Sequence, residues 1–271
     1  MKLNKVTDYT RYVNIVNEFK QVGTISNDYL QAEVSNLIAQ ELLYEYCTTK
    51  NAFLFVEKEG FFRMYYYLND LSQITCFDDV ELVIEILFRG DVSSVNSEIT
   101  YFEKCGFKKN LIRDQYAGRY SDFVNPVKPK GIVIQEASTL DEVQWACELF
   151  NSSFDKWSGD YISINKYPIL LNNGDILLAK DLHGNLLGAT QRELKKGIVN
   201  WAHLAVISSA RGMGIGTLLM DAFIERNHVD DRTRYMMWVQ RQNSTAIRMY
   251  QHKGFKYIGK STISMVKLKK L

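Results

Sequence analysis

The chain has 271 residues, of which 46% are hydrophobic and 24% are charged, a composition that is typical of globular proteins and excludes wholesale disorder. The 33 basic and 31 acidic residues leave a net charge of +2, so there is no overall positive field and nucleic acid is not an expected partner. The longest apolar runs, such as Ala52–Val56, are far shorter than the ~20 residues of a membrane-spanning helix, so we expect no membrane association.

The cysteines favour a reducing compartment. They form no Cys-x-x-Cys pair, and no histidine lies at zinc-finger spacing from them. The first residues also lack the apolar stretch of a secretory signal. We therefore expect a cytoplasmic protein without a metal site, whose four thiols are reduced: Cys47, Cys76, Cys105 and Cys147.

In chain order, the first half begins with two predicted helices. Apolar residues at helical spacing predict a helix over Tyr9–Phe19, capped by Thr7 or Asp8, and a second one over Asp28–Tyr46. The pattern then predicts strands, one further helix and a last strand, in the order Ala52–Glu57, Phe61–Leu68, Val80–Phe88, Asn96–Lys104 (helix) and Phe107–Tyr116.

A break follows at Asn125–Gly131, where two of the three prolines of the chain occur. Residues before proline are extended and glycine ends regular elements, so we predict a linker over 126–131 between domains at 1–125 and 132–271. The second half then alternates strands and helices, which are predicted at Ile132–Gln135, Leu140–Asn151 (helix), Ile176–Lys180, Leu186–Leu194, Ile198–Val206, Gly214–Asn227 (helix), Tyr235–Val239, Asn243–His252 (helix), Phe255–Gly259 and Ile263–Lys267.

The two halves share a short pattern. Phe102-x-x-x-Gly106-Phe107 matches Tyr250-x-x-x-Gly254-Phe255 in spacing, and both patterns follow a strand and a helix. This correspondence favours a duplicated α/β unit.

The most informative run is Arg211-Gly212-Met213-Gly214-Ile215-Gly216-Thr217, which follows a predicted strand and begins an amphipathic helix. Glycines at alternate positions allow a sharp turn that exposes successive N–H groups, and the helix N-terminus adds unpaired donors. Together with the arginine, this arrangement suits a pyrophosphate. The Walker motif does not fit, because Gly216 is not followed by a lysine. The dinucleotide motif does not fit either, because position 217 holds threonine where this motif requires glycine. A tight turn without a ligand is the alternative.

Two motifs resemble the GNAT superfamily of N-acetyltransferases. Arg-x-x-Gly-x-Gly after Leu204-x-Val206 is similar to its acyl-CoA pyrophosphate loop, and Asn243-x-x-Ala246-x-x-x-Tyr250 is similar to its second cofactor motif. The resemblance covers 132–271 and implies two GNAT-like domains in tandem, each an α/β fold with a mixed sheet. The first is degenerate, because Phe102 stands in place of the tyrosine and Arg89–Ser94 holds a single glycine.

The resemblance also implies roles. Backbone groups of Leu204, Ala205 and Val206 would pair with the pantetheine arm of acetyl-CoA. Tyr250 would be the general acid, for which the alternative is a core aromatic residue. The remaining cofactor-binding positions are Arg211, Gly212, Met213, Gly214, Ile215, Gly216, Thr217, Asn243 and Ala246.

The base that takes the proton of the amine has two candidates. By strand alternation, Asn200, Ala202 and Leu204 share one face, whereas Trp201, His203 and Ala205 share the other. His203 is a candidate because of its near-neutral reference pKa, but it is a core histidine if the cofactor lies on the Asn200 face. Glu193 is the second candidate, with a solvated edge carboxylate as its alternative.

The acceptor site is expected in the loop after the helix at Leu140–Asn151. Carboxylates there would attract a cationic amine, and aromatic rings would flank it: Asp155, Trp157, Asp160 and Tyr161. A helix cap with a packed tryptophan is the competing interpretation.

The sequence therefore predicts direct acetyl transfer from acetyl-CoA to the primary amine of a small molecule or peptide, by a monomer or homodimer. The alternatives are a non-catalytic acyl-CoA sensor and a relative that uses aminoacyl-tRNA.

Overall fold

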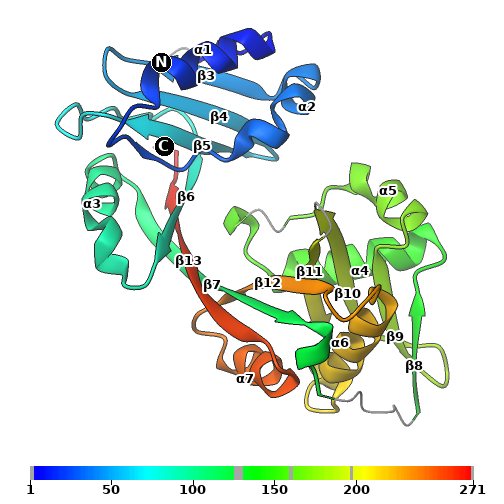
Figure 1. Ribbon diagram of the computed structural model, residues 1–271. Coiled ribbons are helices and arrows are strands. Elements are labelled where there is room, and N and C mark those ends of the chain that lie inside the picture. Colours follow the sequence, from blue (N-terminus) through cyan, green and yellow to red (C-terminus); the bar gives the residue numbers. More distant parts are fainter. Residues whose placement is uncertain (1–2, 125–130, 159–160, 196–197, 270–271) are drawn as a thin grey trace. The chain divides into compact units, whose positions relative to one another are not determined.

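The computed structural model describes residues 3–124, 131–158, 161–195 and 198–269 (Figure 1). Contacts divide the chain into two compact units: unit 1 is Met1–Ile112 with Ser261–Leu271, and unit 2 is Arg113–Lys260. Both divisions fall inside strands, β7 (Lys108–Arg119) and β13 (Lys256–Lys267). The division therefore differs from the boundary predicted at 126–131, most of which lies outside the described residues. No described helix is long and apolar enough to cross a membrane.

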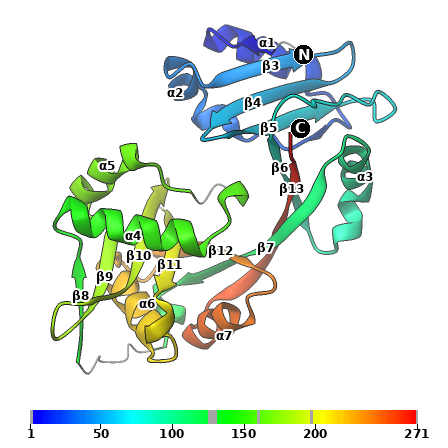
Figure 2. The same ribbon diagram turned by 180° about the vertical axis from the view of Figure 1, so that it is seen from behind.

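Unit 1 is built on a mixed sheet with the strand order β1-β3-β4-β5-β6-β13, and β2 pairs with β5 (Figure 2). Ile263 and Met265 of β13 join its core beside Phe53 and Phe102, which explains why β13 from Ser261 onward belongs to this unit. Its elements are β1 (Asn4–Lys5), α1 (Tyr9–Phe19), β2 (Ile25–Ser26), α2 (Val34–Ala39), β3 (Leu43–Cys47), β4 (Ala52–Lys58), β5 (Phe61–Leu68), β6 (Leu82–Arg89) and α3 (Asn96–Lys104).

The predicted helix over Asp28–Tyr46 is wrong. The helical part, α2, ends where Glu41 adopts a φ of 59° and the N–H of Leu42 donates to the carbonyl of Leu37. The following residues form β3, which pairs with β4 through Leu43↔Val56 and Cys47↔Ala52. Strand pairing therefore overrides the local helical spacing. The predicted helix at Tyr9–Phe19 is confirmed, with the Asp8 carboxylate as its cap at 2.9 Å from the Arg11 amide.

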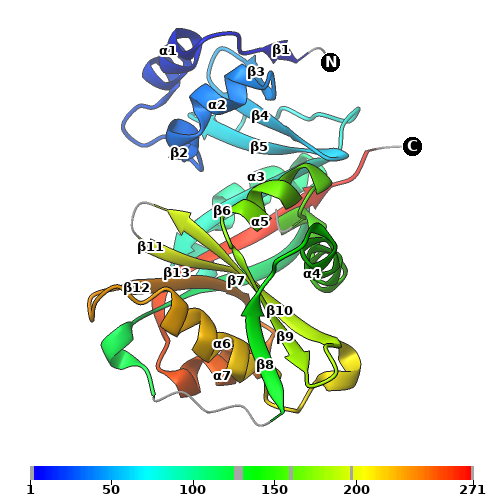
Figure 3. The same ribbon diagram turned by 90° about the vertical axis from the view of Figure 1, so that its right-hand side faces the viewer.

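Unit 2 has the strand order β7-β12-β11-β10-β9-β8, with helix α4 on one face and α6 on the other (Figure 3). Phe150 of α4 packs with Leu178 and Ala205, whereas Phe223 of α6 packs with Trp201. Its elements are β8 (Ile132–Glu136), α4 (Leu140–Ser153), α5 (Tyr167–Asn172), β9 (Ile176–Asp181), β10 (Leu186–Lys195), β11 (Ile198–Val206), α6 (Ile215–Arg226), β12 (Arg234–Gln240) and α7 (Ser244–Lys253).

The elements predicted for the second half are thus confirmed to within two residues at their ends, except that α5 was not predicted and that β13 is one strand rather than two. The mixed α/β fold class is also confirmed.

Candidate functional site

The site begins where two parallel strands of unit 2 part. β11 and β12 pair only through Val199↔Tyr235, Asn200↔Met236 and Trp201↔Met237. β11 continues to Val206, and its other edge stays paired with β10 up to Gly188↔Val206. From residue 202 to residue 206, the edge of β11 on the β12 side therefore faces no paired strand among those described. Such an edge offers backbone N–H and C=O groups to an extended ligand.

A β-bulge lies at the point of divergence. Gln191 pairs with His203 and Arg192 pairs with Trp201, so Ala202 has no opposing residue on β10. The extra residue turns the backbone and reverses which face each later side chain takes. The Trp201 ring stacks on Phe223 of α6 at 4.3 Å, whereas the His203 ring stacks on Phe150 of α4 at 5.0 Å.

The predicted alternation is therefore wrong, because Trp201 and His203 lie on opposite faces of the sheet. Leu204 and Val206 pack with the core on the α6 side, and Ala205 packs on the α4 side. A single residue inserted into a ladder with a period of two reverses every position that follows it.

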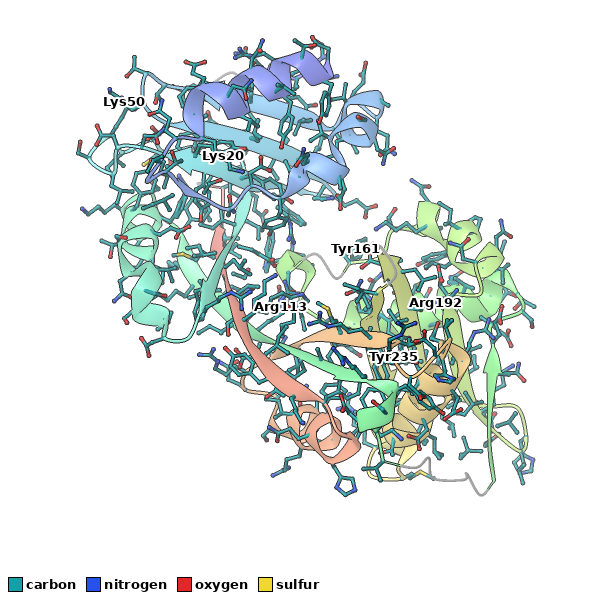
Figure 4. The ribbon with its side chains drawn as sticks, viewed as in Figure 1. Lys20, Lys50, Arg113, Tyr161, Arg192 and Tyr235 are labelled. Carbon is teal, nitrogen blue, oxygen red and sulfur yellow. The ribbon has the colours of Figure 1, made fainter. Side chains whose placement is uncertain are left out.

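Side chains on β10 hold the bulge in place. The buried Thr190 hydroxyl donates to the carbonyl of His203 at 2.8 Å and accepts from Nε1 of Trp201. The guanidinium of Arg192, labelled in Figure 4, donates to Asp175 at 3.0 Å and to Asn227 at 2.9 Å. Both flanks of Ala202 are thus fixed by hydrogen bonds.

The glycine loop has the backbone geometry of an anion-binding nest. Gly212 and Gly214 adopt φ angles of 82° and 78°, and a Cβ at either position would meet no atom within 4 Å. Gly214 is the N-cap of α6, and no side chain caps this helix. The first intrahelical bond of α6 is Leu218 N–H to the Gly214 carbonyl, so the amides of Ile215, Gly216 and Thr217 remain for a ligand.

Gly216 has a different role, because it lies inside α6. A Cβ there would approach the Met249 sulfur of α7 to 3.3 Å and the Leu204 side chain to 3.7 Å. Glycine thus permits close packing between α6, α7 and β11. Arg211 lies just before the nest, and its Nε donates to the carbonyl of Val206 at 3.2 Å, which anchors the guanidinium at the end of β11.

Tyr250 lies on α7 and faces the strand divergence. Its half-buried ring lies 6.1 Å from Trp201 and 6.1 Å from Phe255. Burial raises the pKa of Tyr250 to about 12, so the hydroxyl keeps its proton at neutral pH, as a general acid must. At the start of the same helix, Oδ1 of Asn243 accepts from the Ala246 amide at 3.1 Å and caps α7.

A groove of about 450 Å³ runs between α6 and α7 and adjoins the nest through Thr217. Lys253 and Asp221 form an ion pair at 2.6 Å in this groove, with only 6% of each side chain exposed. Because this pair is neutral overall, Arg248 supplies the remaining positive charge on the lining, and His252 adds ring nitrogens that can form hydrogen bonds. The residues that line the groove are Val124, Thr217, Met220, Asp221, Arg248, Met249, His252 and Lys253.

The two candidate bases differ in access. His203 is 7% exposed, lies between Phe150 and Phe154, and has Nδ1 at 2.7 Å from the Gln191 carboxamide oxygen. This is the environment of a core histidine. Glu193 is exposed on β10, opposite Asn200.

The structure places the predicted acceptor residues in a short turn and its continuation. Oδ1 of Asp155 caps the 3₁₀ turn Lys156–Ser158 by accepting from the amides of Trp157 at 2.9 Å and Ser158 at 3.1 Å. The Lys156 ammonium lies 3.8 Å from the centre of the Trp157 ring. Tyr161 is 45% exposed (Figure 4), and Asp160 lies outside the described residues.

Sequence reasoning missed the bulge at Ala202 and the Thr190 hydroxyl that holds it. A bulge depends on the register of two strands, and no residue type in Trp201-Ala202-His203 indicates that a bulge forms there. The available signal was Thr190 directly after Leu186–Ala189, a run without polar side chains, since a buried hydroxyl requires a partner.

Comparison with known proteins agrees with this geometry. Residues 172–257 match the family model of the acetyltransferase (GNAT) domain. No curated protein matched the sequence.

Solved structures share the fold at low identity. The GCN5-related N-acetyltransferase from Sphaerobacter thermophilus is 13% identical, with a TM-score of 0.57 over 80% of this chain and 76% of that one. A tandem GNAT protein from the clavulanic acid biosynthesis pathway is 13% identical, with a TM-score of 0.58 over 84% and 83%. The glucosamine N-acetyltransferase region of a fungal multi-domain β-N-acetylglucosaminidase is 12% identical, with a TM-score of 0.62 over 97% and 38%. Residues 172–257 thus match the GNAT acetyltransferase domain, and the chain shares the fold of solved GNAT structures.

Proposed function

We propose that unit 2 transfers an acetyl group from acetyl-CoA to the primary amine of a small molecule or peptide, in the cytoplasm, as a monomer or homodimer. The observation that carries this proposal is the continuity of three features: an open strand edge at 202–206, a bulge at Ala202, and an uncapped nest at Arg211–Thr217. An extended arm with a diphosphate at its end has the shape and charge that this sequence of donors accepts.

The residues present fit acetyl-CoA along its whole length. The amides of the nest and Arg211 would bind the diphosphate, and the Leu204–Val206 edge would pair with the amides of the pantetheine arm. The adenosine end would lie in the α6–α7 groove, where Arg248 offers positive charge and His252 a hydrogen-bonding ring to its phosphate. Asn243 and Ala246 begin α7 beside this path, and the side-chain amide of Asn243 remains as a donor because Oδ1 caps the helix.

Two groups would act on the reacting atoms. The acetyl thioester supplies the acyl group and a thiol leaving group. A backbone N–H at the bulge, where Ala202 has no opposing residue on β10, would donate to the carbonyl oxygen as negative charge develops there. The Tyr250 hydroxyl would donate its proton to the departing sulfur. Both donors are held before reaction, one by the strand and the other by the helix.

On the acceptor side, we propose that the amine enters beside the 155–161 segment, where Tyr161 presents an exposed ring and Trp157 and Asp160 contribute. Asp155 would contribute the negative charge of its carboxylate, which also caps the turn. We propose Glu193 rather than His203 as the proton acceptor, since Glu193 is exposed and His203 is enclosed by two phenylalanines. Glu193→Gln should then lower kcat at least tenfold at pH 7. An unchanged kcat in the amine-acetylation assay contradicts this role.

Isothermal titration with acetyl-CoA tests the cofactor site. Gly214→Glu puts a carboxylate and a strained backbone into the nest, and binding should weaken at least a hundredfold. Gly184→Glu is the matched control, because Gly184 also has a positive φ (85°) and open space around it but lies in the β9–β10 turn. Equal binding by the two variants would remove the nest from the proposal.

A non-catalytic acyl-CoA sensor is the second candidate, and the enclosed position of His203 favours it, because one of the two candidate bases is then unable to reach an amine. The two functions differ in one measurement. A sensor binds acetyl-CoA but transfers no acetyl group to any member of an amine library, whereas an acetyltransferase releases the CoA thiol in the presence of its acceptor.

A further inference from the structure

Unit 1 contains a second pair of diverging parallel strands. β5 and β6 pair only through Phe62↔Leu82 and Arg63↔Val83, although β5 continues to Leu68 and β6 to Arg89. The other edge of β5 stays paired with β4 up to Ala52↔Tyr67. This is the arrangement of β10, β11 and β12 in unit 2, where the parted edge is proposed to receive the cofactor.

In unit 1, a segment of the same chain lies on the parted edge. β2 pairs with β5 through Ile25↔Leu68 and Ser26↔Tyr67. β4 already occupies one edge of β5 at Tyr67, so β2 occupies the edge that β6 has left. A short strand therefore pairs where an extended ligand would otherwise add.

The residue after β2 closes the rest of the gap. Asn27 is 5% exposed, and its carboxamide bridges both parted strands. Its oxygen accepts from the Tyr66 amide at 2.9 Å, and its nitrogen donates to the carbonyls of Met64 at 3.4 Å and Glu85 at 3.1 Å. The first two of these groups belong to β5 and the third belongs to β6. One side chain thus satisfies three buried backbone groups that the divergence leaves without a ladder partner.

The nest of unit 2 also has no counterpart here. In unit 2 the nest and α6 connect β11 to β12, so the corresponding connection in unit 1 is 69–81, between β5 and β6. This connection is fully described, contains no helix and has no glycine. The sequence pattern predicts Arg89–Ser94 as the counterpart, but this segment follows β6 and does not connect β5 to β6. Without a helix N-terminus, there is no anion site next to the filled gap.

We propose that Ile25–Asn27 occupies in unit 1 the position that the pantetheine arm takes in unit 2, so that unit 1 is closed to acyl-CoA and each chain binds one cofactor. Ile25–Asn27 is thus an intramolecular ligand of unit 1. Only the stoichiometry depends on the function proposed for unit 2, whereas the occupancy of the gap stands on unit 1 alone.

Residue-resolved amide hydrogen exchange by NMR tests the occupancy without any cofactor. The Tyr66 amide should be protected in the free protein, because its acceptor is the buried Asn27 oxygen. Asn27→Ala should speed its exchange at least tenfold relative to Asn36→Ala, a matched change of an exposed asparagine on α2. Exchange of the wild-type Tyr66 amide at the unprotected rate overturns the proposal, and so does equal exchange in the two variants. The wild-type measurement decides the matter even where Asn27→Ala does not fold.

Titration of the full chain with acetyl-CoA tests the stoichiometry. The expected result is one site per chain, lost entirely in Gly214→Glu, with slowed exchange of amides in 202–206 and unchanged exchange at Met64 and Tyr66. A second site that survives Gly214→Glu, or slowed exchange at Met64 and Tyr66, overturns the proposal. If the wild-type protein binds no acetyl-CoA at all, the function proposed for unit 2 is refuted. Exchange of the Tyr66 amide then still decides whether Ile25–Asn27 occupies the gap between β5 and β6.

Discussion

Replacing Tyr250 by phenylalanine removes one hydroxyl and leaves the packing of the ring intact. The ring centroids of Trp201 and Phe255 both lie 6.1 Å away, so the aromatic contacts survive the change. The core should therefore keep its stability to within about 0.5 kcal/mol, as for substitutions that touch no buried bond. What the variant loses is the proton donor proposed for the leaving sulfur.

The magnitude follows from the role of a general acid. Positioned proton transfer contributes about 10²- to 10⁴-fold, so kcat should fall at least about a hundredfold, or about 2.7 kcal/mol, while the KM for acetyl-CoA changes little. The pKa of Tyr250 is raised to about 12 by burial, and at pH 8 only about one hydroxyl in 10⁴ is ionised. Deprotonation of the Tyr250 hydroxyl should therefore not lower the kcat of the wild type between pH 7 and pH 10.

The assay measures release of the CoA thiol at saturating acetyl-CoA across this pH range. Tyr257→Phe is the control, because Tyr257 is a 41% exposed tyrosine on β13 of the same unit. A Tyr250→Phe kcat within twofold of the wild type would refute the acid role. An alkaline fall in wild-type kcat near pH 9 would refute the proposed protonation state.

Two further changes test the bulge and unit 1. Thr190→Val removes the hydroxyl that donates to the His203 carbonyl, so we expect the free energy of unfolding to fall by about 1–3 kcal/mol and kcat to fall at unchanged KM. Thr190→Ser should restore both. A kcat of Thr190→Val equal to that of the wild type would show that the bulge does not need this hydrogen bond. Burial raises the pKa of Glu98 from 4.5 to about 7 in the folded state, so the unfolded state loses its proton first and stability should fall by about 3 kcal/mol as pH rises from 4.5 to 7. Glu98→Gln should abolish this fall, and a slope unchanged in that variant would assign the pH dependence to other groups.

The resemblance noted in the sequence rests on local features. Glycines that need a positive φ, a helix start without a capping side chain, and helical spacing of apolar residues all depend on neighbours in the chain. For this reason the nest at Arg211–Thr217 and the helices α6 and α7 were predicted close to their observed ends. The fold class followed from the same elements taken in order.

Apart from the unpredicted helix α5, the main errors concern pairing between distant residues. The residues of β3 have helical spacing, and only their pairing with β4 makes them a strand. The face of the sheet on which His203 lies depends on Ala202, which has no opposing residue on β10. The assignment of β13 from Ser261 onward to unit 1 depends on Ile263 and Met265, which lie more than 150 residues from the core that they complete. Register and long-range packing have no local signal, because each strand fits several partners equally well.

By itself, then, the sequence determined the backbone shape of the glycine loop that we propose as the diphosphate site, since Gly212 and Gly214 allow the positive φ angles that the turn requires. Only the tertiary structure decided that the parted strands of unit 2 stay open while those of unit 1 are filled by Ile25–Asn27. The reason is geometric: Asn27 reaches β5 and β6 across 37 and 58 positions of the chain, and no pattern in its neighbourhood reports such contacts.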